Sequence, residues 1–211
     1  MVIKSGVIYI PTLDDEFYDQ PINLDITHRC PLQCPACLRQ SKWYKENRKL
    51  YKEMSVGDII KCAKTISKIS LSGQQSDPLC HSQILDILWI LHSINVNIHT
   101  ATSHNSEEFY EEAFNLSGKQ TTWIFGLDGL PEDSHKHRVN QNGVHLFEMM
   151  KMGARMGANI AWQYIVFNYN QEDVIHCKKM SEEHGMDFRL TKSSRWNKFT
   201  EHLKPDDFWC A

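Results

Sequence analysis

Six short apolar runs alternate with longer runs of helical periodicity along most of this chain, and the alternation limits the fold more than any other feature. Parallel strands need a crossover between them, usually a helix, so this succession indicates a parallel sheet covered by helices. Such right-handed units close into a full barrel when there are eight and curve into a partial one when there are six. The expected strands are residues 22–27, 69–72, 95–102, 121–127, 159–167 and 186–191.

The expected helices carry recognisable signals at their ends. Ser55 is a good N-cap for the first of them, because its hydroxyl can accept a bond from a free backbone N–H group. Gly157 and Gly185 follow the last two helices and suit the left-handed turn that often ends a helix. The expected helices are residues 56–66, 84–94, 107–116, 146–156 and 172–184.

Length and composition indicate one soluble globular domain. The chain has 211 residues, of which 41% are hydrophobic and 23% are charged, enough to build a real core. We expect the barrel to cover about 20–196, with flanking segments 1–19 and 197–211. The net charge of −3 offers no basic field to nucleic acid or to an anionic membrane. Without a signal peptide or an apolar run near the ~20 residues of a membrane span, a cytoplasmic protein is expected.

Three cysteines, Cys30, Cys34 and Cys37, follow the first expected strand with the spacing C-x3-C-x2-C. Three thiolates in one loop can hold three corners of a cubane iron–sulfur cluster and leave one iron open to a small molecule, whereas four close the cluster for electron transfer. A zinc site is an alternative, although zinc prefers four ligands and only His28 is at hand to complete them. Inert core thiols are the other alternative.

The remaining cysteines show no pairing pattern. The total of seven is odd, which argues for a reducing compartment rather than a disulfide framework. An oxygen-sensitive cluster needs the same setting. These other cysteines are Cys62, Cys80, Cys177 and Cys210.

The cysteine spacing and its context resemble those of the radical S-adenosylmethionine (radical SAM) enzymes. In that family, the open iron binds the amino and carboxylate groups of SAM, and an electron from the cluster cleaves SAM to a 5′-deoxyadenosyl radical that takes hydrogen from substrate. The resemblance implies a partial (β/α)6 TIM-like barrel, with a [4Fe-4S] cluster on Cys30, Cys34 and Cys37 and with SAM as second cofactor. It also implies an external electron donor such as flavodoxin or ferredoxin.

Segment 72–78, after the second expected strand, partly resembles the family's G-G-E-P segment, which binds the SAM amino group. The resemblance implies contacts from Gly73, Gln74 and Asp77, with Asp77-Pro78 in place of Glu-Pro. An ordinary strand-to-helix turn is the alternative.

The third expected strand ends in several small hydroxyl side chains. Thr100 matches the family's Thr-Asn-Gly-like segment near the ribose and carboxylate of SAM, and Thr102 and Ser103 could also hydrogen-bond a polar ligand. Hydroxyls here could equally serve the start of the following helix, since Asn105 and Ser106 precede it.

The passage from Phe125 to Arg138 resembles the x-D-G-L…D-x-x-H-x-x-R passage of radical SAM enzymes related to the SPASM group. It implies that Arg138 pairs with the SAM carboxylate through a two-pronged contact. Asp128 could shape the loop or face substrate, and loop-shaping is favoured. A solvated arginine is the alternative. At the end of the fifth strand, Phe167, Asn168 and Asn170 are expected to meet adenine or ribose.

Two further segments bear on the substrate. Residues 192–196 either close the open side over substrate or form plain surface, and Cys210 alone cannot hold the second cluster that many SPASM-type relatives carry in a C-terminal extension. The favoured hypothesis is a radical SAM enzyme acting on a peptide, or alternatively on a small metabolite. The competing hypotheses are a non-catalytic iron–sulfur protein for electron transfer or sensing, and a zinc-stabilised binding module.

Overall fold

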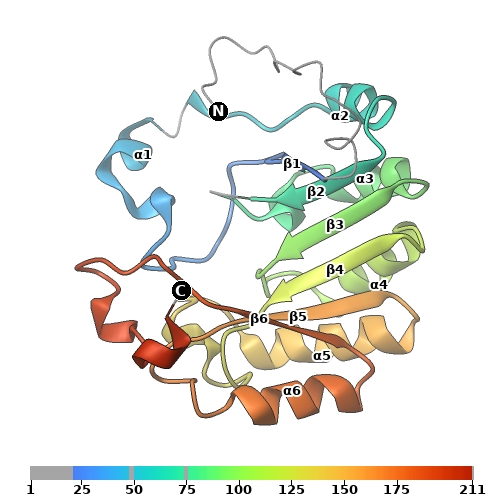
Figure 1. The fold of residues 1–211 in the computed structure, drawn as a ribbon. Helices are drawn as coiled ribbons and strands as arrows, with labels where there is room; N and C mark the ends of the chain where they lie inside the picture. The colour runs from blue at the N-terminus through green and yellow to red at the C-terminus, as the bar shows by residue number, and fades with distance from the viewer. Residues whose placement is uncertain (1–20, 48–49, 74–75, 211) are drawn as a thin grey trace, which may run out of the picture.

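The computed structural model describes residues 21–47, 50–73 and 76–210. Its centre is a curved sheet of six parallel strands in chain order, open between the first and the last strand (Figure 1). This is the expected partial barrel. The strands are β1 (Ile22–Leu24), β2 (Lys68–Ser72), β3 (Asn95–Thr100), β4 (Thr121–Gly126), β5 (Asn159–Ile165) and β6 (Asp187–Thr191).

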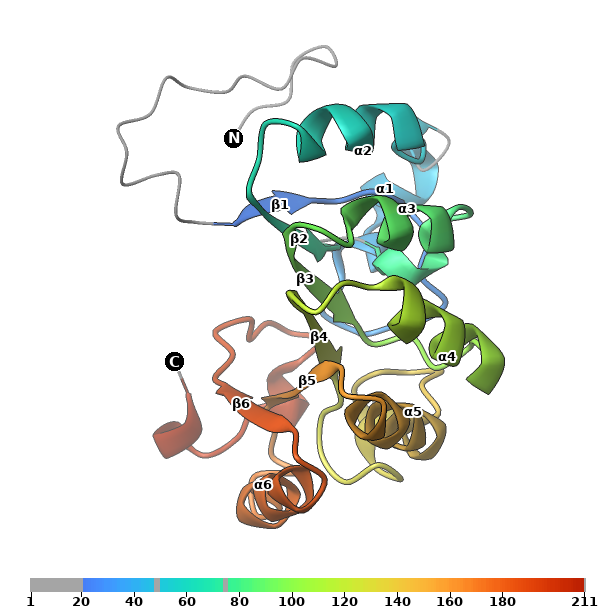
Figure 2. The same cartoon turned by 90° about the vertical axis from the view of Figure 1, so that its right-hand side faces the viewer.

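Five helices follow the first five strands and cover one face of the sheet, as both views show (Figures 1 and 2). Within the described ranges, β6 is followed by two short 3-10 helices and by no α-helix. A short helix, α1 (Lys42–Asn47), lies after the cysteine loop and was not predicted. The covering helices are α2 (Val56–Ala63), α3 (Ile84–Leu91), α4 (Glu107–Leu116), α5 (Gly143–Arg155) and α6 (Val174–Glu183).

Strand alternation divides the sheet into an apolar outer face and a more polar inner face. On β5, Trp162 and Tyr164 are buried among the helices, whereas Gln163 and Ile165 point to the open side. Successive residues of a strand point to opposite faces, so one strand serves both the core and the cavity.

The predicted helix signals operate at the expected places. Ser55 caps α2 by accepting a bond from the Asp58 N–H group, and Gly157 and Gly185 have positive φ angles of 83° and 67° after α5 and α6. The first strand is shorter than predicted because residues 25–27 leave the sheet, where the Ile26 carbonyl accepts a bond from the Met54 N–H group. Among the described residues, the helices are all too short or too polar to cross a bilayer.

Candidate functional site

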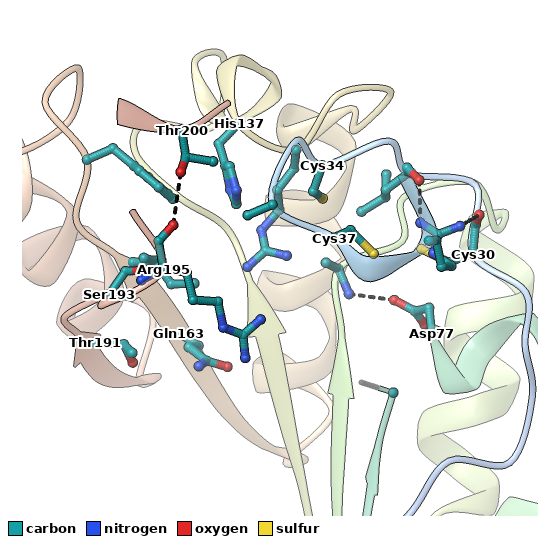
Figure 3. Close-up of a pocket in the computed structure, with 18 of the residues that line it drawn as sticks. Cys30, Cys34, Cys37, Asp77, His137, Gln163, Thr191, Ser193, Arg195 and Thr200 are labelled. Carbon is teal, nitrogen blue, oxygen red and sulfur yellow. Dashed lines mark hydrogen bonds between the residues drawn. The ribbon is translucent and has the colours of Figure 1, made fainter. Parts of the chain in front are cut away.

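The three motif cysteines line one cavity at the carboxyl ends of the strands. Cys30, Cys34 and Cys37 are half-buried, unpaired, and gathered on one side of a cavity of about 450 Å³ (Figure 3). The loop is fixed locally by a bond from the Cys37 N–H group to the Cys34 carbonyl (3.0 Å), and the Gln33 N–H group donates to Val139 from the loop after β4 (3.0 Å). The predicted loop therefore lies where chemistry gathers in parallel barrels.

Arg39, which the sequence analysis did not single out, braces this loop from within. Its guanidinium donates to the Cys30 carbonyl (2.6 Å) and to the Leu32 carbonyl. Burial, followed by the charge of Asp77, raises the pKa of the Cys30 thiol to about 12, and Arg39 offsets part of that rise. Burial also raises the pKa of Cys34. Thiolates at these positions therefore need a cationic partner such as a metal centre.

The motif thiols do not converge as the ligands of a single metal ion do. In the described part of the chain, no three Cys, His, Asp or Glu side chains converge in a way that could hold one ion. A zinc ion needs all its ligands within about 2.0–2.3 Å. In a cubane, by contrast, each thiolate binds a different iron, so the three thiols need not converge on one point. His28, the suggested fourth zinc ligand, lines a neighbouring cavity instead.

Asp77 joins the loops that follow β2 and β3. Its buried carboxylate accepts bonds from the Thr100 hydroxyl (2.9 Å) and from the N–H groups of Ala101 (2.8 Å), Thr102 (3.0 Å) and Leu79 (3.1 Å). Burial raises the pKa of Asp77, and these hydrogen bonds act in the opposite direction. The residue lines the cavity beside the cysteines, yet its oxygens are already engaged by the protein (Figure 3). A contact with the SAM amino group stays a prediction.

Other predicted SAM contacts differ in how close they lie to this cavity. Gly73 lines it, and Gln74 lies outside the described residues. Thr100 and Ser103 are buried and hydrogen-bonded to protein, with the Ser103 hydroxyl accepting a bond from the Asn142 N–H group (2.7 Å). Neither of them, nor Thr102, is among the residues that line the cavity.

Arg138 reaches the cavity from the loop after β4 and is held there by Asp128. The Arg138 Nε and the His137 Nδ1 atoms lie 2.8 Å and 3.1 Å from the same Asp128 oxygen, while the other oxygen accepts a bond from the Ile165 N–H group (3.0 Å). Burial raises the pKa of Asp128, but Arg138 and His137 outweigh it and hold that pKa below its usual value. A fully buried carboxylate thus orients the arginine toward the cavity.

Gly126 makes this approach possible. A Cβ atom at position 126 would lie only 2.6 Å from the Arg138 Nη2 atom, well inside ordinary contact distance. Glycine at the end of β4 therefore leaves room for the arginine in this position, a role that the sequence pattern alone did not reveal.

The end of β5 places one predicted residue in the cavity and one outside it. Phe167 lines the cavity, with its ring centroid 4.2 Å from that of His137 and 6.0 Å from that of Trp196. Asn168 instead donates to the carbonyls of Leu203 (3.0 Å) and His202 (2.8 Å) and anchors the segment after β6.

The wall opposite the cysteines is formed by β5 and by the segment after β6 (Figure 3). Sequence reasoning considered residues 192–196 as a possible cover, and they do line the cavity. It missed Gln163, Thr191 and Thr200. Strand alternation could have identified Gln163, because it shares the inner face with Ile165 at the end of β5.

No protein-family model and no curated protein match this sequence. Solved structures do match its fold. SuiB from Streptococcus suis, bound to S-adenosylmethionine, has a TM-score of 0.68 at 15% identity over 88% of this chain and 44% of its own. Methylornithine synthase (PylB) has a TM-score of 0.64 at 12% identity over 88% and 56%.

A third match is the radical SAM methyltransferase TsrM from Kitasatospora setae, whose structure holds cobalamin and a [4Fe-4S] cluster. Its TM-score is 0.60 at 14% identity, over 90% of this chain and 40% of its own. The chain spans less than half the length of the SuiB and TsrM chains. At these identities the likeness concerns the fold, and the chain has the fold of the radical SAM enzymes.

Proposed function

We propose that this protein is a radical SAM enzyme, with a [4Fe-4S] cluster on Cys30, Cys34 and Cys37 and with SAM bound beside it. The observation that carries the proposal is the position of three free thiols on one wall of a 450 Å³ cavity at the carboxyl ends of a curved parallel sheet. The remainder of that cavity leaves room for a ligand at the open iron.

The residues of the chain have distinct tasks in this proposal. The cluster and SAM, when bound, supply a 5′-deoxyadenosyl radical that abstracts hydrogen from substrate. Arg39 holds the cysteine loop in shape through two backbone carbonyls. Arg138, aligned by Asp128, binds the SAM carboxylate, and Phe167 offers an apolar surface to the adenosyl part. The walls exclude water, which protects a reactive intermediate from side reactions.

The proposed substrate is a peptide, with a small metabolite as the second possibility. One structure of SuiB is bound to its precursor peptide SuiA and matches this chain with a TM-score of 0.64 at 16% identity, over 87% of this chain and 41% of its own. That likeness supports a peptide without naming one. An external donor such as flavodoxin or ferredoxin would deliver the electron.

The alternative is an iron–sulfur protein that transfers or senses electrons without chemistry on SAM. Such a protein needs a cluster near the surface but no ligand cavity beside it. The cavity and the inward-facing Arg138 favour the enzyme.

Anaerobic reconstitution with iron and sulfide tests the proposal. We expect about four irons per chain by the cubane stoichiometry, a change in the electron paramagnetic resonance spectrum of the reduced cluster on addition of SAM, and 5′-deoxyadenosine when a reductant is present. A cluster whose spectrum does not respond to saturating SAM would favour the electron carrier.

A further inference from the structure

Among the described residues that line the cavity, cationic side chains outnumber carboxylates, with the cysteine thiols counted apart as cluster ligands. Its lining includes the cationic side chains Arg39, Arg138, Lys192 and Arg195, and a single carboxylate, Asp77. The Asp77 oxygens are occupied by hydrogen bonds from the protein. The lining therefore has cationic capacity that its own carboxylate does not neutralise.

Three of the four cations have partners within the protein. Arg39 donates to the cysteine loop, Arg138 pairs with Asp128, and Lys192 Nζ donates to the Phe208 carbonyl (2.8 Å). The Arg195 guanidinium is different, because it has no hydrogen bond or ion pair to any residue in the ranges that the structure describes. It is the cation of this cavity that remains free for a ligand.

The backbone around Arg195 is nevertheless ordered. The buried Thr200 hydroxyl donates to the Arg195 carbonyl (2.9 Å) and accepts a bond from the Asn197 N–H group (3.0 Å), and the Arg195 N–H group donates to the Ser193 hydroxyl (3.2 Å). Figure 3 shows the Arg195 side chain extending from this turn into the cavity toward Gln163, across from the cysteines. A fixed backbone thus presents an unpaired guanidinium to the cavity.

The inner face of the sheet near Arg195 also carries polar and positively charged side chains. Gln163 is paired in register with Arg189 on the inner face of the sheet. Burial, and to a lesser degree the charge of Arg189, lowers the pKa of the nearby His99, although a hydrogen bond with Gln163 opposes the shift. Next to Arg195, the Trp196 indole N–H group is buried without an acceptor among the described residues. Of these groups, Gln163 and Arg195 both line this side of the cavity.

We propose that Arg195 binds an anionic group of the substrate, a carboxylate or a phosphate, on the side of the cavity opposite the cysteine loop. The planar guanidinium fork matches two oxygens of either group, which a lysine cannot do. This inference rests on the proposed function, since it assigns the substrate end of the same cavity. It also separates two anion sites, Arg138 for the SAM carboxylate and Arg195 for the substrate.

Matched small probes test the assignment. Equilibrium dialysis of reconstituted, SAM-loaded protein would compare N-acetylalanine with N-acetylalaninamide, which differ only in the carboxylate, and with methyl phosphate. In the wild type we expect one of the anions to bind about ten- to a hundredfold more tightly than the amide, as for a charge-assisted pair. The better anion identifies the group as carboxylate or phosphate.

Substitutions test whether the preference for an anion over the amide depends on Arg195. Arg195→Gln should remove the difference between anion and amide, and Arg195→Lys should restore only a small part of it. Lys198→Gln removes a neighbouring exposed charge that does not line the cavity, so it should keep the wild-type preference. Because Arg195 is exposed and its side chain supports no other residue, both substitutions at this position should leave the circular dichroism spectrum unchanged.

Two results would overturn the inference: an amide that binds the wild type as tightly as both anions, or an anion preference that persists in Arg195→Gln. The proposed function is tested separately on the same preparations, by measuring the iron content and the response of the cluster spectrum to SAM. A protein that responds to SAM but shows no anion preference refutes the Arg195 assignment alone. If the cluster fails to assemble, dialysis of the metal-free protein still decides whether Arg195 binds anions.

Discussion

Gly126→Ala should destabilise the protein through Arg138. The added Cβ would stand 2.6 Å from the Arg138 Nη2 atom and 2.8 Å from its Cζ atom. These distances are roughly 1 Å short of ordinary contact, so the guanidinium must move by about that much. Its Nε atom lies 2.8 Å from Asp128, whose side chain is fully buried, and a shift of this size would weaken that contact. Leaving a buried charge without its partner costs about 3–5 kcal/mol, which sets the upper bound for this substitution.

Urea unfolding of the metal-free protein measures the effect, and a double-mutant cycle assigns its cause. In an Arg138→Ala background there is no guanidinium to displace, so Gly126→Ala should cost only about 1 kcal/mol or less, leaving a coupling free energy of up to about 3 kcal/mol. Gly57→Ala is the matched control, because a Cβ there would meet only the Ser55 hydroxyl at 3.8 Å. An equal cost of Gly126→Ala in both backgrounds would show that Arg138 is not the group displaced.

Three further predictions concern the cluster, SAM and pH. Alanine at any one of the three motif cysteines should abolish the brown absorbance of reconstituted protein, whereas Cys62→Ala should retain it; equal losses would refute the ligand assignment. Arg138→Ala should weaken SAM binding about ten- to a hundredfold, measured by dialysis, with an intact cluster, and lysine should rescue little; wild-type affinity would mean that this arginine does not bind SAM. Arg138 and His137 outweigh burial and lower the pKa of Asp128, so the resulting stabilisation is complete above the unfolded pKa of about 3.9 and is lost as pH falls through the folded pKa. Acid titration of the unfolding free energy should show this loss, and Arg138→Ala should abolish it.

Local signals were sufficient to predict most of the fold. The helix over 107–116 begins and ends as predicted because Ser106 caps it and its apolar spacing is regular. The region after β6 was harder to predict, and the structure forms two 3-10 turns there, Glu201–Leu203 and Asp207–Trp209. This segment is held by contacts between residues far apart in sequence. The Asn168 side chain and N–H group donate to carbonyls about 34 residues later and tie the segment to the end of β5. The sequence pattern within the segment does not predict such a distant contact.

The location of the site could be predicted from the topology. Which of its side chains are hydrogen-bonded to the protein could not. Parallel strands bring their carboxyl ends to one edge, so the cysteine loop and Arg138 were expected to meet there. Whether a polar side chain at that edge faces a ligand or the protein depends on partners from other loops, as the Asp77 carboxylate illustrates through its bonds to the end of β3. Arg195 is the opposite case. The sequence does not show which carboxylates lie near an arginine, so its lack of a partner among the described residues becomes visible only in the structure. Among the described cationic side chains of the cavity, Arg39, Arg138 and Lys192 have protein partners, and the Arg195 guanidinium, which has none, is where we propose that an anionic substrate binds.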